Sequence, residues 1–564
     1  MRLLFVFCLI FYSVSAYCAY PGELPKNEIS INYMDTNIST ITHLVKSKKI
    51  SCEQLIQGYI NRIEQYDLAY TKNKPPINAI IAINPFALSQ ARRIDSALSS
   101  EKNLSLLCIP VVVKDNIDTK DTPTSAGSIS LLGSQPNQDA FIVKKLRQAG
   151  AVIIGKAGMD EFASGTWGIN SRLGRTGDVY DTNVLPGGSS SGVAAAVSAG
   201  FALVGIGSDN SGSLRIPAAA NGVYTIRGGT GVVSQTGIFP RGDLDAMAGP
   251  IAQNIEDVAK VMDVIAVKDS QDKKTQAVRR PTSYTQFLSA DALKGKRIGI
   301  VTLYGDQKIN YDGKLAKPYY QQAIQMMKQH GATIVPSIQF KQFITDRSNN
   351  TAGEVQQINA YLASFPSTRK NFKDICESNR TRIFGTPKQC VEYSHTNPRF
   401  NGSAYKKVLK MFTTNRSLIE EKMRQLHLDA LLLPISEAGV PNAHFDNQYY
   451  TILSPNSGLP AVEFIVGFTK TNPSLPVAMQ LIGRQNSEAK LLGMAYAFTR
   501  VVKRKPPVLN EKASSESFDT IAEFNNRKTE IGYLTYKKLI QKQGVKSVTP
   551  KAFLSILLNP HLKP

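Results

Sequence analysis

Two short loops rich in glycine and serine carry most of the chemistry-bearing groups in this sequence. The first reads Gly187-Gly188-Ser189-Ser190-Ser191-Gly192, and the second runs from Ser208 to Pro217. Glycine lets a backbone turn tightly and brings its N–H groups close to a ligand. Serine supplies a hydroxyl that can act as a nucleophile or pass on a proton. Upstream, Lys114 ends the run Pro110-Val111-Val112-Val113. These segments therefore contain a hydroxyl that could act as a nucleophile and an amine that could act as a base.

The hydroxyl of a serine is inert at neutral pH unless a base lies nearby. Histidine is the usual base, but none of the six histidines falls in a glycine-serine loop. A lysine can take its place if burial disfavours the charged form and lowers the pKa. Because Lys114 ends an apolar strand, we expect it to be partly buried.

The patterns around these loops alternate between strand and helix, which predicts an α/β fold with a sheet covered by helices. Residues 106–113 form an almost uninterrupted apolar run, which suits a strand buried on both faces. Small residues over 192–199 predict a helix, and 202–206 predict the strand that leads into the second loop. The pattern weakens over 341–403, which we interpret as an insertion, and residues 506–564 form a basic C-terminal extension.

The first residues have the pattern of a secretory signal peptide. A single positive charge at Arg2 precedes an uncharged apolar run, and small residues follow. The run is too short to span a bilayer. We therefore predict a signal peptide over residues 1–19 and an exported protein, periplasmic or secreted. No later stretch is long and apolar enough for a membrane span, so stable membrane insertion is not expected.

The formal charge of +22 would favour acidic partners. The lysines are scattered, however, and no nucleic-acid-binding motif stands among them, so we expect no nucleic-acid partner. The cysteines show neither zinc-finger nor CxxC spacing. Cys376 and Cys390 are the best candidates for a disulfide because they share one polar stretch, whereas Cys108 reads as a small core residue.

Taken in order, the three polar pieces resemble the amidase signature family of serine hydrolases. The matching segments are Val113-Lys114-Asp115, the loop from Gly187 to Gly192, and Asp209-Asn210-Ser211-Gly212-Ser213-Leu214-Arg215. The separation between Ser189 and Ser213, 24 residues, is that of the family. Weaker matches, such as Met159-Asp160-Glu161-Phe162 and Leu475-Pro476-Val477-Ala478-Met479, extend the resemblance over roughly residues 35–505.

The resemblance implies a role for each matching residue. Ser213 would be the nucleophile and Lys114 would be the base. Ser189, which lies in a cis peptide in the family, would be the proton relay. Backbone N–H groups from Asn210 to Ser213 would form the oxyanion hole. That part of the site comprises Asn210, Ser211 and Gly212, and the expected supporting residues are Ser190, Asp209, Arg215 and Met159.

The implied fold is a single large α/β domain, with a mixed many-stranded sheet between layers of helices. The implied function is hydrolysis of a carboxylic amide C–N bond through an acyl-enzyme, with release of ammonia or an amine. Neither a metal nor a cofactor is expected. The partner would be a small-molecule or peptide amide, and the resemblance leaves open which amide is cleaved and the oligomeric state.

Two departures from the family pattern keep other readings open. Ser211 replaces a usual glycine, and Thr225-Ile226-Arg227-Gly228-Gly229-Thr230 replaces the usual Gly-Leu-Lys-Pro-Thr segment. One alternative is an inactive relative that binds a ligand. A second is the amidase subunit of a tRNA-dependent amidotransferase, which the predicted signal peptide disfavours.

A third alternative is a nucleophile elbow at Ser190, completed by Asp446 or another late acid and a late histidine. An elbow needs a hydrophobic strand immediately before it, and a polar loop precedes this one. A last alternative gives these segments no function: the loops are only turns, and Lys114 is the solvated end of a strand.

Overall fold

The computed structural model describes residues 31–69, 74–101, 103–242, 246–378, 387–442, 448–509 and 520–530. The predicted signal peptide lies outside the described residues, and so does most of the C-terminal extension. Asp446, considered for the nucleophile elbow, lies outside them too.

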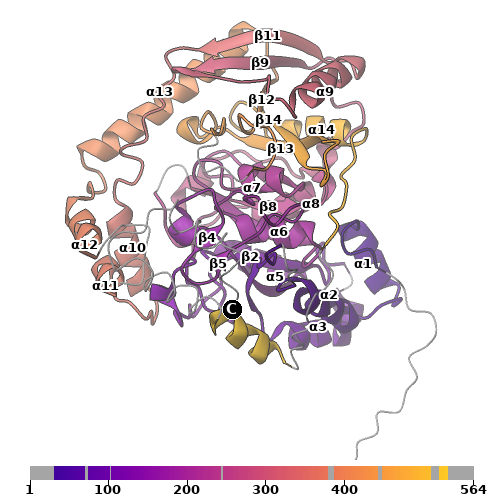
Figure 1. Cartoon of the computed structure of the whole chain (residues 1–564), viewed down its shortest axis with the longest axis vertical. Helices are drawn as coiled ribbons and strands as arrows, with labels where there is room; N and C mark the ends of the chain where they lie inside the picture. Colours follow the sequence, from indigo (N-terminus) through magenta and orange to yellow (C-terminus); the bar gives the residue numbers. More distant parts are fainter. Residues whose placement is uncertain are drawn as a thin grey trace, which may run out of the picture. The chain divides into compact units, whose positions relative to one another are not determined.

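A sheet of 12 strands, counted within the described residues, forms the centre of the fold (Figure 1). The strands follow the order β1-β3-β2-β6-β8-β7-β13-β14-β12-β9-β10, and β11 pairs with the other side of β9. Their bounds are β1 Ile80–Ile83, β2 Pro110–Lys114, β3 Val152–Ala157, β6 Val204–Asp209, β7 Tyr224–Arg227, β8 Met247–Ala252, β9 Arg297–Tyr304, β10 Gln307–Lys308, β11 Thr333–Phe340, β12 Ala430–Pro434, β13 Ala461–Phe468 and β14 Pro476–Ile482. A separate small ribbon pairs β4 (Ile169–Asn170) with β5 (Gly174–Arg175).

The sheet is mixed, as predicted. β2 lies parallel to both of its neighbours, β3 and β6. From β6 through β8, β7, β13 and β14 to β12, each pair is antiparallel. β9 is again parallel to β12 and β11. The parallel trio β3-β2-β6 holds the strand that ends in Lys114.

Helices pack on both faces of this sheet. Phe464 of β13 meets Phe498 of α14, with ring centroids 5.2 Å apart. The adjacent Glu463 interacts electrostatically with Arg215 of α7. Because successive side chains of a strand point to opposite faces, α14 and α7 cover opposite faces. The helices are α1 Ile38–Lys46, α2 Cys52–Tyr66, α3 Ala87–Ser96, α4 Leu98–Glu101, α5 Phe141–Gln148, α6 Ser191–Ser198, α7 Arg215–Ala220, α8 Ile255–Ile265, α9 Lys317–Gln329, α10 Glu354–Ala363, α11 Phe372–Glu377, α12 Pro387–Thr396, α13 Ser403–Gln425 and α14 Glu488–Thr499.

Small residues bring α6 close to the sheet. Every residue of this helix is buried. Gly205 of β6 faces it, and a Cβ at this position would overlap the side chain of Val193. The close approach places the start of α6, and with it the first glycine-serine loop, against the end of β6.

The weakly patterned insertion contains three helices, α10, α11 and α12, that lie together (Figure 1). Their apolar side chains share a cluster with residues of the main domain, including Leu131, Phe162 and Phe239. Tyr361 of α10 also donates a hydrogen bond to Asp118, at 2.6 Å. The insertion is therefore packed onto the domain. The helix that follows it, α13, begins at Ser403.

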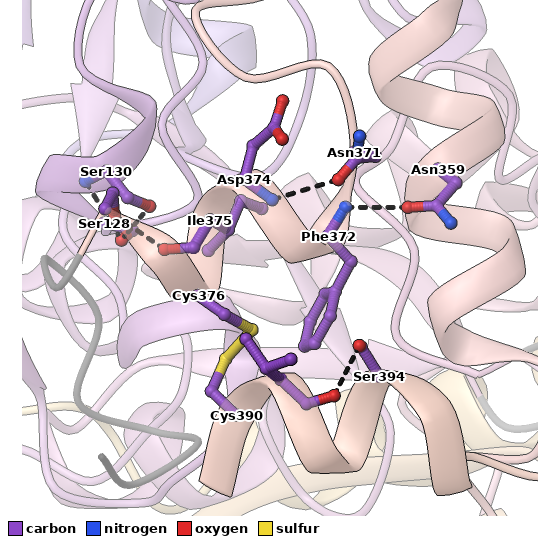
Figure 2. Close-up of a disulfide and its surroundings, with 12 residues drawn as sticks. Ser128, Ser130, Asn359, Asn371, Phe372, Asp374, Ile375, Cys376, Cys390 and Ser394 are labelled. Atoms are coloured by element: carbon purple, nitrogen blue, oxygen red, sulfur yellow. Dashed lines mark hydrogen bonds between the residues drawn. A yellow bond between two sulfur atoms is a disulfide. The ribbon is translucent and has the colours of Figure 1, made fainter. Parts of the chain in front are cut away.

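Two disulfides occur among the described residues. Figure 2 shows Cys376 of α11 joined to Cys390 of α12, with Phe372 beside the bridge, which confirms the predicted pair. The prediction for Cys108 was wrong, because this residue is bonded to Cys52. Cys108 is buried as expected, but its partner lies 56 residues away at the start of α2, a separation that carries no pairing signal.

The described part of the C-terminal extension packs against the domain. Residues 521–530 are helical. Lys528 is fully buried and pairs with Asp67 at the end of α2. The side-chain amide of Asn525 both accepts from the N–H and donates to the carbonyl of Ile83 in the edge strand β1. Across the described ranges, none of the helices has the length and apolar character needed to cross a bilayer.

Candidate active site

The predicted site residues come together along one edge of the sheet, the edge at which the carboxyl ends of the central strands β2 and β6 lie. β2 and β6 run parallel and pair directly, with Val113 opposite Ile206. Their carboxyl ends therefore lie side by side and place Lys114 next to Ser208 and Asp209. The first glycine-serine loop meets the same edge at the start of α6, where the N–H of Ser190 donates to the carbonyl of Ser213, at 3.1 Å.

Lys114 is fully buried and lies among hydroxyl groups. Its Nζ is 2.7 Å from Ser189 Oγ and 2.9 Å from Ser208 Oγ. Burial lowers the pKa of Lys114 to about 7, although the negative charges of Asp160 and Asp209 act in the opposite direction. A substantial fraction of this lysine is thus neutral at physiological pH, which a general base requires.

Ser189 follows a cis peptide bond between Gly188 and Ser189. Its carbonyl accepts a hydrogen bond from the N–H of Asp160, at 3.1 Å. The Asp160 carboxylate in turn accepts from the N–H groups of Trp167 and Gly168. A Cβ on Gly188 would collide with this carboxylate, so the close packing of the two segments requires glycine there. Burial raises the pKa of Asp160 to about 6, against the opposing effect of these N–H groups and Lys114.

Asp209 holds the loop that carries Ser213. Its carboxylate accepts from the N–H of Gly212 at 2.7 Å and from the N–H of Leu214 at 3.1 Å, on either side of the predicted nucleophile. Arg215 donates to the same carboxylate at 3.1 Å. Burial alone would raise the pKa of Asp209, but Arg215 and Arg227 outweigh it and hold the pKa below its usual value. The aspartate is therefore a permanent anion that shapes the loop.

The oxyanion site predicted from the sequence changes in one detail. The Gly212 N–H is directed at Asp209 Oδ1 and so is not presented to a substrate. Within the described residues, the backbone donors left as candidates are the N–H groups of Asn210, Ser211 and Ser213. Gly212 itself has φ of 149°, and a Cβ there would crowd Thr451 and Ile216, which accounts for the glycine.

The side chain of Ser190 bonds to the backbone. Its Oγ donates to the carbonyl of Ser208 at 3.1 Å and accepts from the Ser208 N–H at 3.2 Å, so the hydroxyl joins the first loop to the end of β6. The residues before it form a loop, which does not fit a nucleophile elbow. Met159 is also buried, and its carbonyl accepts from Asn170 Nδ2 at 2.7 Å. This contact joins Met159 to the small ribbon formed by β4 and β5.

The sequence analysis assigned no role to three residues that contribute to the site, Ser208, Asn116 and Asp160. Ser208 Oγ lies between Lys114 and the side-chain amide of Asn116, which donates to it at 3.1 Å. Asp160 adjoins Gly188. Asp160 lies inside a matched motif and Ser208 lies directly before one, both as polar residues near a strand end, and that position was the available signal. No group of three or more metal-ligating side chains is arranged to hold a metal in the part of the chain that the structure describes.

Comparison with known proteins gives consistent matches. A family model described as Amidase matches residues 54–492. A glutamyl-tRNA(Gln) amidotransferase subunit of Thermoanaerobacter pseudethanolicus is 30% identical over 488 residues, which cover 83% of this chain and 96% of that protein. Native peptide amidase from Stenotrophomonas maltophilia has a similar structure, with TM-score 0.76, 29% identity, and coverage of 85% of this chain and 99% of that chain. An amidase family protein from Bacillus anthracis matches with TM-score 0.74 and 29% identity, covering 85% of this chain and 93% of that chain.

Proposed function

This chain belongs to the amidase signature family, and we propose that it is an exported amidase that hydrolyses a linear carboxylic amide through an acyl-enzyme on Ser213. The observation that carries the proposal is the contact between Lys114 Nζ and Ser189 Oγ, 2.7 Å, at a lysine with no exposed surface. A buried lysine of lowered pKa, in contact with a serine next to the nucleophile loop, can activate a hydroxyl without histidine.

In the proposed reaction, Ser213 attacks the amide carbonyl carbon and passes its proton through Ser189 to neutral Lys114. Backbone N–H groups of the Asn210–Ser213 loop stabilise the negative charge that develops on the carbonyl oxygen. The C–N bond then breaks. The leaving nitrogen takes the proton back along the same path and departs as ammonia or an amine.

The acyl-enzyme is resolved by the same groups in reverse. Water attacks the ester carbonyl of Ser213, and its proton moves through Ser189 to Lys114. Collapse of the second tetrahedral intermediate returns the proton to Ser213 Oγ and releases the carboxylic acid. Each half-reaction needs Lys114 to begin neutral, because a charged lysine cannot accept a proton.

We propose peptide amides as the first substrate class to examine. The support is the similarity to the protein from Stenotrophomonas maltophilia, which is named as a peptide amidase. Export is proposed as well. It is supported by the two disulfides, since disulfides persist in oxidising compartments and are rare in the cytosol.

A second candidate function follows from the relative in Thermoanaerobacter pseudethanolicus, which is named as an amidotransferase subunit. In that case the chain would release ammonia from an amide such as glutamine for use by partner subunits. Comparing initial rates on glutamine and on a C-terminal peptide amide separates the two proposals. Turnover of glutamine alone would favour the amidotransferase reading.

The proposed nucleophile is tested by intact mass after exposure to a fluorophosphonate probe. We expect one adduct on the wild-type protein and none on Ser213→Ala. Ser190→Ala is the matched control, because it removes a neighbouring serine hydroxyl that bonds to the backbone of Ser208. An adduct that survives Ser213→Ala but disappears in Ser190→Ala would overturn the assignment, and a folded wild type without an adduct would favour an inactive binding protein.

A further inference from the structure

The backbone carbonyls of the nucleophile loop are held by side chains from distant parts of the chain. The carbonyl of Asn210 accepts a hydrogen bond from Arg347 Nη2, at 3.1 Å. The next carbonyl, that of Ser211, accepts from the hydroxyl of Thr451. Arg347 belongs to the segment that opens the 341–403 insertion, outside every motif that identified the site.

These contacts determine where the N–H groups of the loop point. In a trans peptide unit, the C=O of one residue and the N–H of the next point in opposite directions. Holding the Asn210 carbonyl against Arg347 therefore directs the Ser211 N–H to the opposite side, away from the guanidinium. In the same way, holding the Ser211 carbonyl against Thr451 directs the Gly212 N–H to Asp209.

The positive charge of Arg347 also polarises the peptide that it contacts. A hydrogen bond from a charged donor to a carbonyl is stronger than a neutral one, and linked hydrogen bonds polarise one another. The N–H of the Ser211 peptide becomes a better donor as a result. Ser211 supplies one of the three N–H groups that remain candidates for the oxyanion hole.

The guanidinium is itself held in place by buried amides. Arg347 Nη1 donates to Asn456 Oδ1, and Asn456 Nδ2 donates to the carbonyl of Ile344 at 3.2 Å. Asn415 of α13 accepts from the N–H of Ile344 at 2.8 Å and donates to its carbonyl at 2.9 Å. Both asparagines are fully buried. Two buried side chains thus hold the backbone at Ile344, three residues before Arg347.

We propose that Arg347 is a positioning residue of the oxyanion hole, which orients the Asn210–Ser211 peptide so that the Ser211 N–H faces the substrate carbonyl. This role rests on the proposed acyl-enzyme function of Ser213. It makes the insertion a part of the catalytic machinery, through one hydrogen bond from outside the signature motifs.

The test compares Arg347→Ala and Arg347→Lys with wild type. Loss of an oxyanion donor costs about 100-fold or more in rate, so we expect Arg347→Ala to lower both kcat and the rate of fluorophosphonate labelling by about 10-fold to 100-fold, with KM unchanged. Arg347→Lys should recover part of the rate, because a lysine keeps the charge but lacks the planar fork that reaches two acceptors. Affinity for a peptide aldehyde, which mimics the tetrahedral intermediate, should fall with kcat.

Arg369→Ala is the matched control. Arg369 also lies in the insertion and also donates to a backbone carbonyl, that of Ser130 at 3.0 Å, which belongs to a segment remote in sequence from the nucleophile loop. We expect this variant to keep the wild-type labelling rate. Thermal midpoints of all variants identify any loss of folding, and Arg347→Lys provides the readout if Arg347→Ala does not fold.

The outcomes separate this role from the proposed function. Equal labelling rates in wild type and both Arg347 variants would overturn the positioning role and leave Ser213 as the nucleophile. A rise in KM with unchanged kcat would also overturn it, because Arg347 would then act in substrate binding. A wild-type protein that is never labelled would overturn the acyl-enzyme function, and this role with it.

Discussion

The pH dependence of the reaction follows from the environment of Lys114. Its pKa of about 7 means that the neutral fraction falls about tenfold for each pH unit below that value, to about one hundredth at pH 5. Above about pH 8 the lysine is almost fully neutral, and the rate should reach a plateau. Because the relay is needed in both half-reactions, acylation and overall turnover should share this profile.

The assay is the second-order rate of fluorophosphonate labelling of Ser213 from about pH 5 to about pH 9. The probe has no titrating group in this range, so the profile reports the enzyme. Lys114→Met removes the base while keeping an apolar side chain of similar length. It should label about 100-fold to 10,000-fold more slowly than wild type at neutral pH, with no inflection near pH 7.

The same pKa predicts a cost in stability. In the unfolded chain Lys114 has its ordinary pKa of 10.5, whereas in the fold it loses its proton at about 7. Between these values the unfolded state binds one more proton, so stability falls as the pH decreases from 10.5 to about 7 and does not change further below that. At about 1.4 kcal/mol per pH unit the full effect is about 5 kcal/mol.

Lys114→Met should lack this slope. The difference in free energy of unfolding between variant and wild type should therefore move in favour of the variant as the pH is lowered from about 10 to about 7. Urea unfolding at several pH values measures it. A labelling profile that is flat across the whole range, together with a pH-independent stability difference, would refute the reasoning that burial makes Lys114 a neutral base.

Three further predictions concern the scaffold. Gly188→Ala should destabilise the fold by about 1–3 kcal/mol and abolish labelling, because the new Cβ collides with the Asp160 carboxylate; wild-type labelling and thermal midpoint would contradict this. Lys528→Met should cost about 3–5 kcal/mol, since it leaves Asp67 as an unpaired buried charge, and an unchanged midpoint in urea would show that the C-terminal helix is not docked. Cys390→Ser should cost about 3 kcal/mol, the value for closing a loop of this length, given a separation of 14 residues; equal thermal midpoints under oxidising conditions would argue against the bridge.

The predictable part of the site lies in short contiguous segments. The two glycine-serine loops and the apolar strand that ends in Lys114 are recognisable from local composition, and the family resemblance then indicated Ser189 and Ser213 within the loops. The pair Cys376 and Cys390 was identified for a similar reason, since both lie in one stretch. The Cys52–Cys108 bridge was missed because it joins two segments whose proximity is produced by packing of the whole domain.

The residues that hold Lys114 and the two loops in place are distributed along the chain. Asp160, Ser208 and Arg347 contact Lys114 or the two glycine-serine loops, and the sequence assigned no role to any of them. Arg347 lies 134 residues after Ser213 and in a weakly patterned region. No local pattern distinguishes an arginine that contacts a loop carbonyl from one that faces solvent.

By itself, the sequence predicted an α/β fold, and its resemblance to the family predicted the order of the candidate catalytic segments and amide hydrolysis as the type of chemistry. Periodicity, glycine turns and hydroxyl-bearing loops are local properties, because they depend on residues that are consecutive in the sequence. The tertiary structure alone decided that Lys114 is fully buried and has a lowered pKa, that the Gly212 N–H points to Asp209, and that Arg347 reaches Asn210. Burial, hydrogen-bond direction and charge proximity are properties of residues brought together from distant segments, and they exist only once the chain is folded.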